Sequence, residues 1–122
     1  MPRVVHFEIM ADDPDRVVKF FKKVFDWEIN KWEGPVDYWL IKTGEESEPG
    51  IDGAITKRTD PNAHIQNTID VPDIDEYAKK VEENGGKLVT EKMAVPGVGW
   101  LYYFLDTEGN LHGMMQSDQS AK

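Results

Sequence analysis

The sequence predicts an α+β fold of two βαβββ repeats, whose curved mixed sheets surround a concave cavity with the helices outside. Three observations predict this fold: strand-like segments alternate apolar and polar residues, two segments have the period of an amphipathic helix, and the order of these elements recurs. A chain of 122 residues has the length of one domain with one core. We therefore expect a single domain over residues 1–122, with repeat one at about 3–58 and repeat two at about 64–117.

The first repeat begins with a strand that is followed by a helix. Val5, Phe7 and Ile9 alternate with polar His6 and Glu8, as in a strand that buries one face. The elements expected next are a helix that is capped by Asp13, starts at Pro14 and has an apolar stripe from Val17 to Val24, and strands at 26–32, 38–43 and 53–58.

The second repeat follows the same plan about 60 residues later. Its expected elements are a strand at 65–71, a helix that is capped by Asp73 and ended by Gly85 and Gly86, and strands at 87–95, 100–105 and 111–117. The shift places Ile9 on Ile69 and Gly53 on Gly113. The two halves therefore resemble each other in the order of their elements.

The composition and net charge exclude some classes of partner and indicate a cellular compartment. The chain has no cysteine, which excludes disulfides and thiolate chemistry and fits a cytoplasmic protein. With 14 basic and 23 acidic residues the net charge is −9, so nucleic acid and membranes are not expected as partners and a cationic ligand is favoured. The sequence has no run of about 18 apolar residues that would span a membrane, and no signal peptide is expected before the first strand.

Three segments give the chain a family resemblance. The segment Val5–Arg16, the turn Asn84–Gly86 and the segment Tyr103–Asn110 resemble the opening, the mid-domain marker and the last turn of glyoxalase and bleomycin-resistance proteins, which belong to the vicinal-oxygen-chelate superfamily. The match extends over nearly the whole chain. The resemblance implies the paired βαβββ fold, a homodimer, and functions that range from metal-dependent lyases and dioxygenases to metal-free binders of drugs.

The resemblance also implies where a divalent metal would bind. Metal-dependent members of the family have four ligands, and the matching positions here are His6, Gly53, Gln66 and Gly113. Of these, His6 is a good ligand, Gln66 is a weak neutral oxygen donor, and the glycines have no side chain. We therefore expect no cofactor, and a residual divalent-metal site would depend on His6 with Gln66.

Other polar residues near these positions leave alternatives open. Glu8 shares the face of His6, and His64 lies at the entry of the second repeat, so a site made from these three side chains is conceivable. His112 should point to the opposite face of the last strand. His6 suits acid–base chemistry near neutral pH, with Glu8 or Asp70 as partner, and it equally suits a structural hydrogen bond to a neighbouring strand.

Aromatic side chains are abundant on the expected strands. The chain has four Trp, four Tyr and five Phe residues, which offer a flat apolar surface for a ligand but more often fill a core or an interface. Alternation places Trp100 and Tyr102 on one face of their strand but leaves open which side of the sheet that face is. The residues expected to contact a ligand are His6, Glu8, Gln66, Thr68, Trp39, Trp100, Tyr102 and Gly113.

These observations favour a binding protein and leave two enzymes open. The favoured function is metal-free binding of a small aromatic or cationic organic molecule in the cavity. The alternatives are a metal-dependent lyase, isomerase or dioxygenase, and a metal-free acid–base enzyme that uses His6. The catalytic residues are not identified by the sequence, and His6 and Glu8 are the candidates.

Overall fold

The computed structural model describes all 122 residues and contains two compact units. His6–Gln66 form one, which we call the first-repeat unit, and Met1–Val5 with Asn67–Lys122 form the other, the second-repeat unit. The divisions fall inside two strands of the chain, after Val5 and after Gln66. Neither helix of the chain has the length and apolar character needed to cross a membrane.

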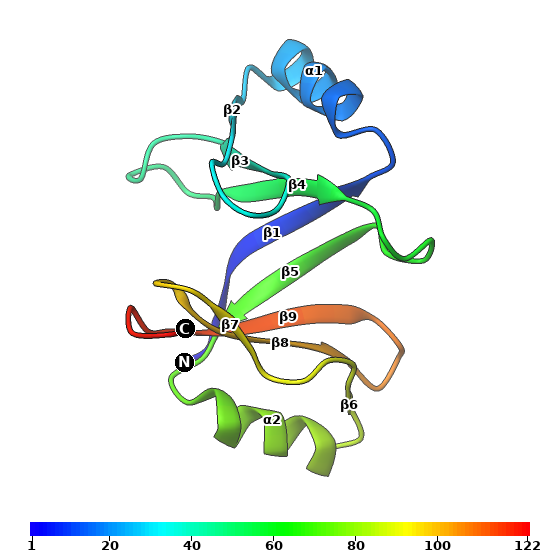
Figure 1. Cartoon of the computed structure of the whole chain (residues 1–122), viewed down its shortest axis with the longest axis vertical. Coiled ribbons are helices and arrows are strands. Elements are labelled where there is room, and N and C mark those ends of the chain that lie inside the picture. The colour runs from blue at the N-terminus through cyan, green and yellow to red at the C-terminus, as the bar shows by residue number, and fades with distance from the viewer. The chain divides into compact units, whose positions relative to one another are not determined.

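The first-repeat unit has one helix and four strands that pair as a mixed sheet (Figure 1). Its strands lie in the order β2-β3-β4-β1, with β1 and β4 parallel and the other pairs antiparallel. The elements are β1 (Arg3–Ala11), α1 (Pro14–Phe25), β2 (Glu28–Lys31), β3 (Tyr38–Lys42) and β4 (Gly53–Lys57).

The second-repeat unit repeats this plan with one extra strand. Its strands lie in the order β5-β9-β8-β6, β7 also pairs with β8, and the β5–β9 pair is parallel. The elements are β5 (Ile65–Asp70), α2 (Ile74–Glu83), β6 (Lys87–Leu88), β7 (Met93–Val95), β8 (Gly99–Leu105) and β9 (Leu111–Ser117). The α+β fold expected from the sequence is confirmed.

Both helices begin as expected. The side chain of Asp13 accepts a hydrogen bond from the backbone N–H of Arg16 at 3.2 Å, and Asp73 accepts one from Glu76 at 3.2 Å. Each cap satisfies an N–H that has no partner inside the helix. Pro14 fits the first turn of α1 because that turn needs no N–H from it.

The two helices end differently. In α1 the chain turns at Asp26, which adopts a left-handed conformation (φ 57°) and donates its N–H to the carbonyl of Lys22. In α2 the left-handed residue is Gly85 (φ 92°), and the N–H of Gly86 reaches the carbonyl of Val81 at 2.9 Å. The glycine pair therefore ends α2 as predicted, because glycine adopts this conformation without strain.

Each unit has its core between its helix and one face of its sheet, which we call the helix face. Ile55 is fully buried in the first-repeat core, and Ile74 and Met114 are nearly or fully buried in the second. The side chains that pack around the first core include Phe7, Ile9, Val17, Phe21, Trp27 and Trp39, and those around the second include Ile69, Tyr77, Trp100, Tyr102 and Phe104.

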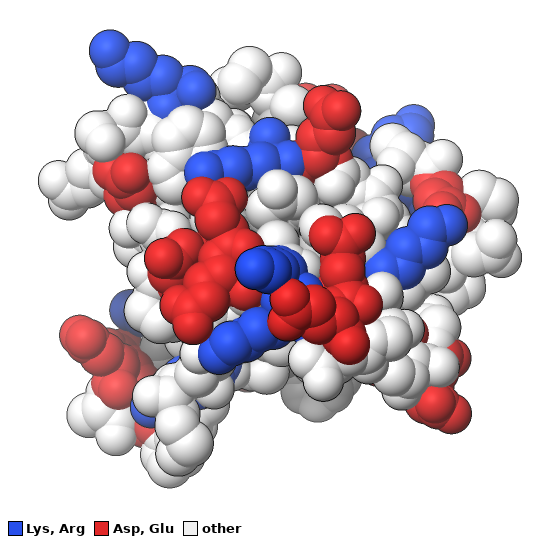
Figure 2. Space-filling model, turned by 90° about the horizontal axis from the view of Figure 1, so that it is seen from below, with Lys and Arg blue, Asp and Glu red and all other residues white.

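The outer surface of the α2 end is charged with both signs. Seen from below the view of Figure 1, acidic and basic side chains lie intermixed there (Figure 2). Lys80 pairs with Glu76 at 3.4 Å and Lys92 with Asp75 at 3.1 Å, and three of the four side chains are more than half exposed, while that of Lys92 is 34% exposed. Such exposed pairs contribute little to stability, so this surface keeps the helix hydrated on its outer side.

One expected strand is interrupted. The segment 87–95 forms two short strands, β6 and β7, instead of a single one. Between them the hydroxyl of Thr90 accepts the backbone N–H of Tyr103 at 3.1 Å, where a continuous strand would offer a carbonyl. Val89 still donates its N–H to the carbonyl of Tyr103 at 2.9 Å, so the Thr90 side chain replaces the next backbone acceptor of the ladder and the regular pairing stops there until β7.

The internal repeat is offset by one residue in the last strand. Gly53 lies opposite Phe7, whereas Gly113 lies opposite Thr68, the counterpart of Glu8. A Cβ atom at Gly53 would collide with the ring of Phe7, so Gly53 faces the helix side. The match of Gly53 to a ligand position of the same site as His6 is therefore wrong, because the two residues face opposite sides of the sheet.

The residue of β4 that takes the place equivalent to Gly113 is Ala54, because Ala54 lies opposite Glu8. A uniform shift of 60 residues does not show this difference, because Ala54 follows Glu8 by 46 residues whereas Gly113 follows Thr68 by 45.

Candidate functional site

The face of the first-repeat sheet away from α1, which we call the opposite face, carries the polar side chains. Residues paired across parallel or antiparallel strands point to the same side of a sheet, so Glu8 shares a side with Ala54 and, one strand further, with Leu40. His6 and Tyr38 lie on the same side by alternation. The first strand therefore presents His6 and Glu8 side by side, with the small Ala54 next to them.

His6 is hydrogen-bonded to an aromatic residue of β3. The Nε2 atom of His6 lies 2.9 Å from the hydroxyl of Tyr38, and either group suits the role of donor. Burial lowers the pKa of His6 below its usual value, and the negative charges of Glu8 and Asp52 oppose this shift without cancelling it. His6 is therefore neutral near pH 7, and its partner is Tyr38 instead of a residue of β5.

Glu8 and Gln66 form a buried polar pair. The amide Nε2 of Gln66 donates to Oε1 of Glu8 at 2.9 Å, and the two residues are only 4% and 7% exposed, Gln66 being the more buried. The other amide atom, Oε1 of Gln66, is buried and has no hydrogen-bond partner. Turning the amide over would set its oxygen against an ionised carboxylate, so the charge on Glu8 fixes this orientation.

An unpartnered buried carbonyl oxygen is costly. Leaving such an acceptor without a donor costs on the order of 1–3 kcal/mol, and native proteins contain few of these groups. The oxygen of Gln66 is thus an unsatisfied acceptor beside a buried carboxylate, and a donor N–H or O–H placed there would remove the penalty.

Two aromatic side chains lie at the His6 end of this face. The rings of Trp32 and Tyr38 meet edge to face, with centroids 6.2 Å apart. Trp32 donates its backbone N–H to the carbonyl of Tyr38 at 2.7 Å, and its ring lies over Gly34, where any Cβ would collide with it. The turn between β2 and β3 therefore holds the indole beside Tyr38, and its side chain stays 37% exposed.

The aromatic residues expected to contact a ligand lie on the helix faces. Trp39 pairs with Ile55 and packs in the core under α1. Trp100 and Tyr102 pack in the core under α2, and the indole N–H of Trp100 donates to Asp118 at 3.0 Å. Trp39 thus lies on the side of its sheet away from Glu8, and Trp100 and Tyr102 lie on the side of theirs away from Gly113.

The opposite face of the second-repeat unit carries Thr68, Gly113 and Tyr103. Thr68 lies opposite Gly113, and Gly113 lies opposite Tyr103, so the three share one side of the sheet. A Cβ at Gly113 would press on the ring of Tyr103 and on the hydroxyl of Thr68. Asp70 of β5, which the sequence offered as a partner of His6, is exposed to solvent.

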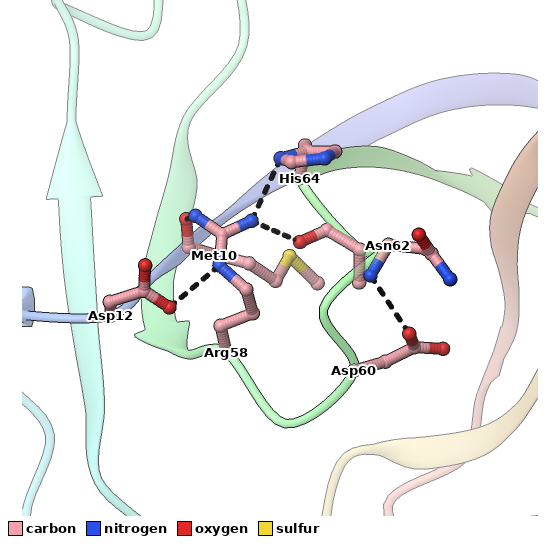
Figure 3. A network of polar contacts seen from close by, with 7 residues as sticks. Met10, Asp12, Arg58, Asp60, Asn62 and His64 are labelled. Atoms are coloured by element: carbon pink, nitrogen blue, oxygen red, sulfur yellow. Dashed lines mark hydrogen bonds and ion pairs between the residues drawn. The ribbon is translucent and has the colours of Figure 1, made fainter.

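His64 belongs to a different network, which holds the segment between the two repeats (Figure 3). The guanidinium of Arg58 donates to Asp12 at 2.9 Å, to the carbonyl of Met10 at 3.3 Å and to the carbonyl of Ala63, and it lies 2.8 Å from Nδ1 of His64. Because a guanidinium can only donate, Nδ1 of His64 is the acceptor. This network ties the linker to the end of β1.

His112 is also engaged elsewhere. It lies opposite Phe104 on the helix face, away from Gly113 as expected, and its ring stacks on that of Phe104. Its Nε2 lies 2.9 Å from Asp106, and this contact lowers the pKa of the Asp106 carboxyl below its usual value.

The residues present do not fit a divalent metal. A protein site for Zn²⁺ or a similar ion takes at least three His, Cys or carboxylate ligands within one small sphere. No group of three or more such side chains is brought together anywhere in the chain. His64 is bound to Arg58, and the positions matching the family's other ligands are Gln66, Gly113 and an alanine.

Trp32 and Tyr38 lie beside His6, although Trp39 and neither of these two was among the residues expected to contact a ligand. The alternation of residues along β3 indicates these faces, because Trp39 and Ile41 point to one side of the sheet and Tyr38 points to the other. Trp39 and Ile41 continue the apolar alternation into the core, which leaves Tyr38 beside His6. The alternation of β3, together with the apolar character of Trp39 and Ile41, thus places Tyr38 on the opposite face.

Comparison with known proteins agrees with the fold. The family model of the Glyoxalase/Bleomycin resistance protein/Dioxygenase superfamily matches residues 3–113. A glyoxylase-like domain-containing protein of Didymella fabae is 30% identical over 115 residues, which are 88% of this chain and 88% of that protein.

Solved structures with the same fold are more distant in sequence. A hypothetical protein of Bacillus halodurans C-125 superposes with a TM-score of 0.73 at 15% identity, covering 99% of this chain and 98% of that one. The methylmalonyl-CoA epimerase of Streptomyces coelicolor, in complex with 2-nitronate-propionyl-CoA, gives 0.71 at 16% identity over 98% and 97%. The epimerase of Mycobacterium tuberculosis gives 0.69 at 13% identity over 94% and 87%. The chain is thus a member of the glyoxalase/bleomycin resistance protein/dioxygenase superfamily.

Proposed function

We propose that this protein binds a small organic molecule without a metal ion, on the opposite face of the first-repeat sheet. The observation that carries the proposal is the buried, unpartnered Oε1 of Gln66, held in place by Glu8. A buried acceptor without a donor is stabilised when a ligand supplies one.

The surroundings support an aromatic or cationic ligand. Glu8 is a carboxylate on the same face, and the whole chain carries a net charge of −9, which attracts cations. Trp32 and Tyr38 offer aromatic surface at the other end of the face, next to His6.

The test is a binding screen with protein that has been freed of metal. The protein is dialysed against EDTA, and aromatic and cationic compounds are screened by the shift in Tm and confirmed by isothermal titration calorimetry. We expect binding in EDTA that is lost in Gln66→Leu and retained in Ile65→Ala, whose side chain is exposed on the next residue. Binding that appears only after Ni²⁺, Zn²⁺, Fe²⁺ or Mn²⁺ is added would overturn the proposal.

A second function is a metal-free acid–base enzyme in which His6 takes a proton from a bound substrate. The observation that favours it is the neutral His6 in contact with the Tyr38 hydroxyl, because a general base must be unprotonated at working pH. Once a ligand is known, its solvent-exchange rate in D₂O with and without the protein tests this function. Exchange that His6→Gln leaves unchanged would exclude His6 as the base.

A further inference from the structure

The opposite face of the first-repeat sheet has two ends of different chemistry. At one end the rings of Trp32 and Tyr38 meet edge to face, and Trp32 is 37% exposed. At the other end the only unsatisfied atom is an acceptor, Oε1 of Gln66, and its neighbour Glu8 is an anion. The first end suits an aromatic ring, and the second suits a donor with positive charge.

A lower bound on the distance between the ends follows from the geometry of β1. His6, bound to Tyr38, and Glu8, bound to Gln66, are two residues apart on one strand, so their side chains are separated by about 6.5–7 Å. The rings and the acceptor lie farther apart than this, because Tyr38 is on β3 and Gln66 is on β5, on either side of β1 in the strand order. A ligand that reaches both ends therefore needs a spacer of several bonds between its ring and its donor group.

We propose that the ligand is an arylalkylammonium ion, whose ring lies against Trp32 and Tyr38 and whose ammonium donates to Oε1 of Gln66 beside Glu8. This inference rests on the proposed function and names the ligand class of that same site. An ammonium has three N–H donors and no acceptor, so it satisfies Gln66 and is attracted by the charge of Glu8 at the same time.

The same chemistry rejects related molecules. A carboxylate at the end of the chain would meet the oxygen of Gln66 and the anion of Glu8, both of which repel it. An alkylamine without a ring forgoes the contact with Trp32 and Tyr38. Because Oε1 of Gln66 is buried, the ligand reaches it only when the covering side chains move, so we expect association slower than about 10⁵ M⁻¹s⁻¹.

The experiment is a titration of the full chain in EDTA with ω-phenylalkylamines that have one to six methylene groups. The ω-phenylalkanols and ω-phenylalkanoates of the same lengths serve as neutral and anionic counterparts, and unbranched alkylamines serve as ligands without a ring. We expect the amines to bind most tightly at an intermediate length, and the alkanoates of that length to bind at least tenfold more weakly.

Variants then test which residues contact each end of the ligand. Gln66→Met removes the acceptor and Trp32→Ala removes the ring contact, and each should weaken the best amine by about tenfold or more, whereas Ile65→Ala should leave it unchanged. Glu8→Gln should weaken the amine more than the alkanol of equal length, because only the amine is charged.

The outcomes separate this inference from the proposed function. If alkanols or alkanoates bind in EDTA as tightly as the amines, or if affinity does not depend on length, the inference fails while binding without metal stands. If no member of the series or of the wider screen binds in EDTA, both fail. The comparison among ligands uses the wild-type chain, so it remains decisive even if a variant does not fold.

Discussion

The two units have the same order of elements but carry different residues at equivalent positions of their sheets. In the first-repeat unit the opposite face presents Glu8 across from Ala54, and in the second-repeat unit it presents Thr68 across from Gly113. The carboxylate of Glu8, which pairs with Gln66, thus has the hydroxyl of Thr68 as its counterpart in the second-repeat unit. The unsatisfied acceptor and its carboxylate neighbour are thus found in the first unit, which is where the proposed function places the ligand.

The helices of the two units also differ in how deeply their residues are buried. No residue of α1 is fully buried, and Phe20, Val24 and Phe25 are each more than half exposed. In contrast, α2 buries Ile74 completely and Ala78 almost completely. The unit with the unsatisfied polar pair is therefore also the one whose helix has no fully buried residue.

The largest expected effect tests whether the two cores are equal in strength. Ile55 and Met114 take equivalent places, opposite Ile9 and Ile69, and both are almost completely buried. We expect Ile55→Ala and Met114→Ala each to lower the free energy of unfolding by about 2–5 kcal/mol, because each leaves a cavity. Urea unfolding followed by circular dichroism measures both. A loss below about 1 kcal/mol at either site would show that its unit repacks freely.

The next effect concerns the polar pair itself. Gln66→Leu removes the donor to Glu8 and should cost at most about 1–3 kcal/mol, because the loss is offset in part by removal of the unsatisfied Oε1, whereas Thr68→Val, on the same face of the second-repeat unit, should cost less. The double variant Glu8→Leu with Gln66→Leu should cost less than the sum of its single variants, because it removes both partners together. The same urea titrations give all four values, and strictly additive losses would show that the two side chains do not depend on each other.

Local signals in the sequence predicted the elements well. The caps Asp13 and Asp73, the proline at the first turn of α1 and the glycines after α2 act through contacts within a few residues. Such contacts depend on neighbouring residues alone, so a single sequence contains the information. The family resemblance, carried by short motifs of this kind, is confirmed by the match over residues 3–113.

The side of the sheet that an aromatic residue faces depends on contacts far along the chain. Trp39 and Trp100 alternate as strand residues should, but only their pairing with Ile55 and Gln116 fixes the face on which they lie. The one-residue offset that separates Gly53 from the place of Gly113 likewise comes from strand pairing. Alternation without a strand register allows either face of each strand to point toward the core, which is why the side that each aromatic residue faces could not be predicted from the sequence.

A smaller effect compares the two helix caps. Asp13→Ala and Asp73→Ala each remove one hydrogen bond to a backbone N–H and should lower stability by about 0.5–2 kcal/mol. The loss at Asp13 should also appear locally, because α1 has no fully buried residue to hold it. Hydrogen exchange of the amides in each helix distinguishes a local loss from a global one. Equal protection of α1 and α2 in both variants would contradict the difference in packing.

The smallest expected effect is a dependence of stability on pH that is specific to the first-repeat unit. Burial holds the pKa of His6 below its usual value of 6.5 in the folded chain. As the pH falls below that value, the unfolded chain binds a proton at His6 before the folded chain does. The free energy of unfolding therefore falls in this window, from about pH 6.5 down to the folded pKa, and the loss is complete below it.

The measurement is urea unfolding of the wild-type chain and of His6→Gln at several pH values between about 7.5 and 5. Glutamine keeps a group that can bond to the Tyr38 hydroxyl but has no proton to gain. We expect the stability of the wild type relative to His6→Gln to decline as the pH is lowered, because only the wild type carries the buried imidazole. A difference that stays constant with pH would mean that His6 is solvated in the folded chain, and a difference that grows at low pH would mean that its protonated form is the one the fold stabilises. Either result would remove the argument that the first-repeat unit holds a neutral base.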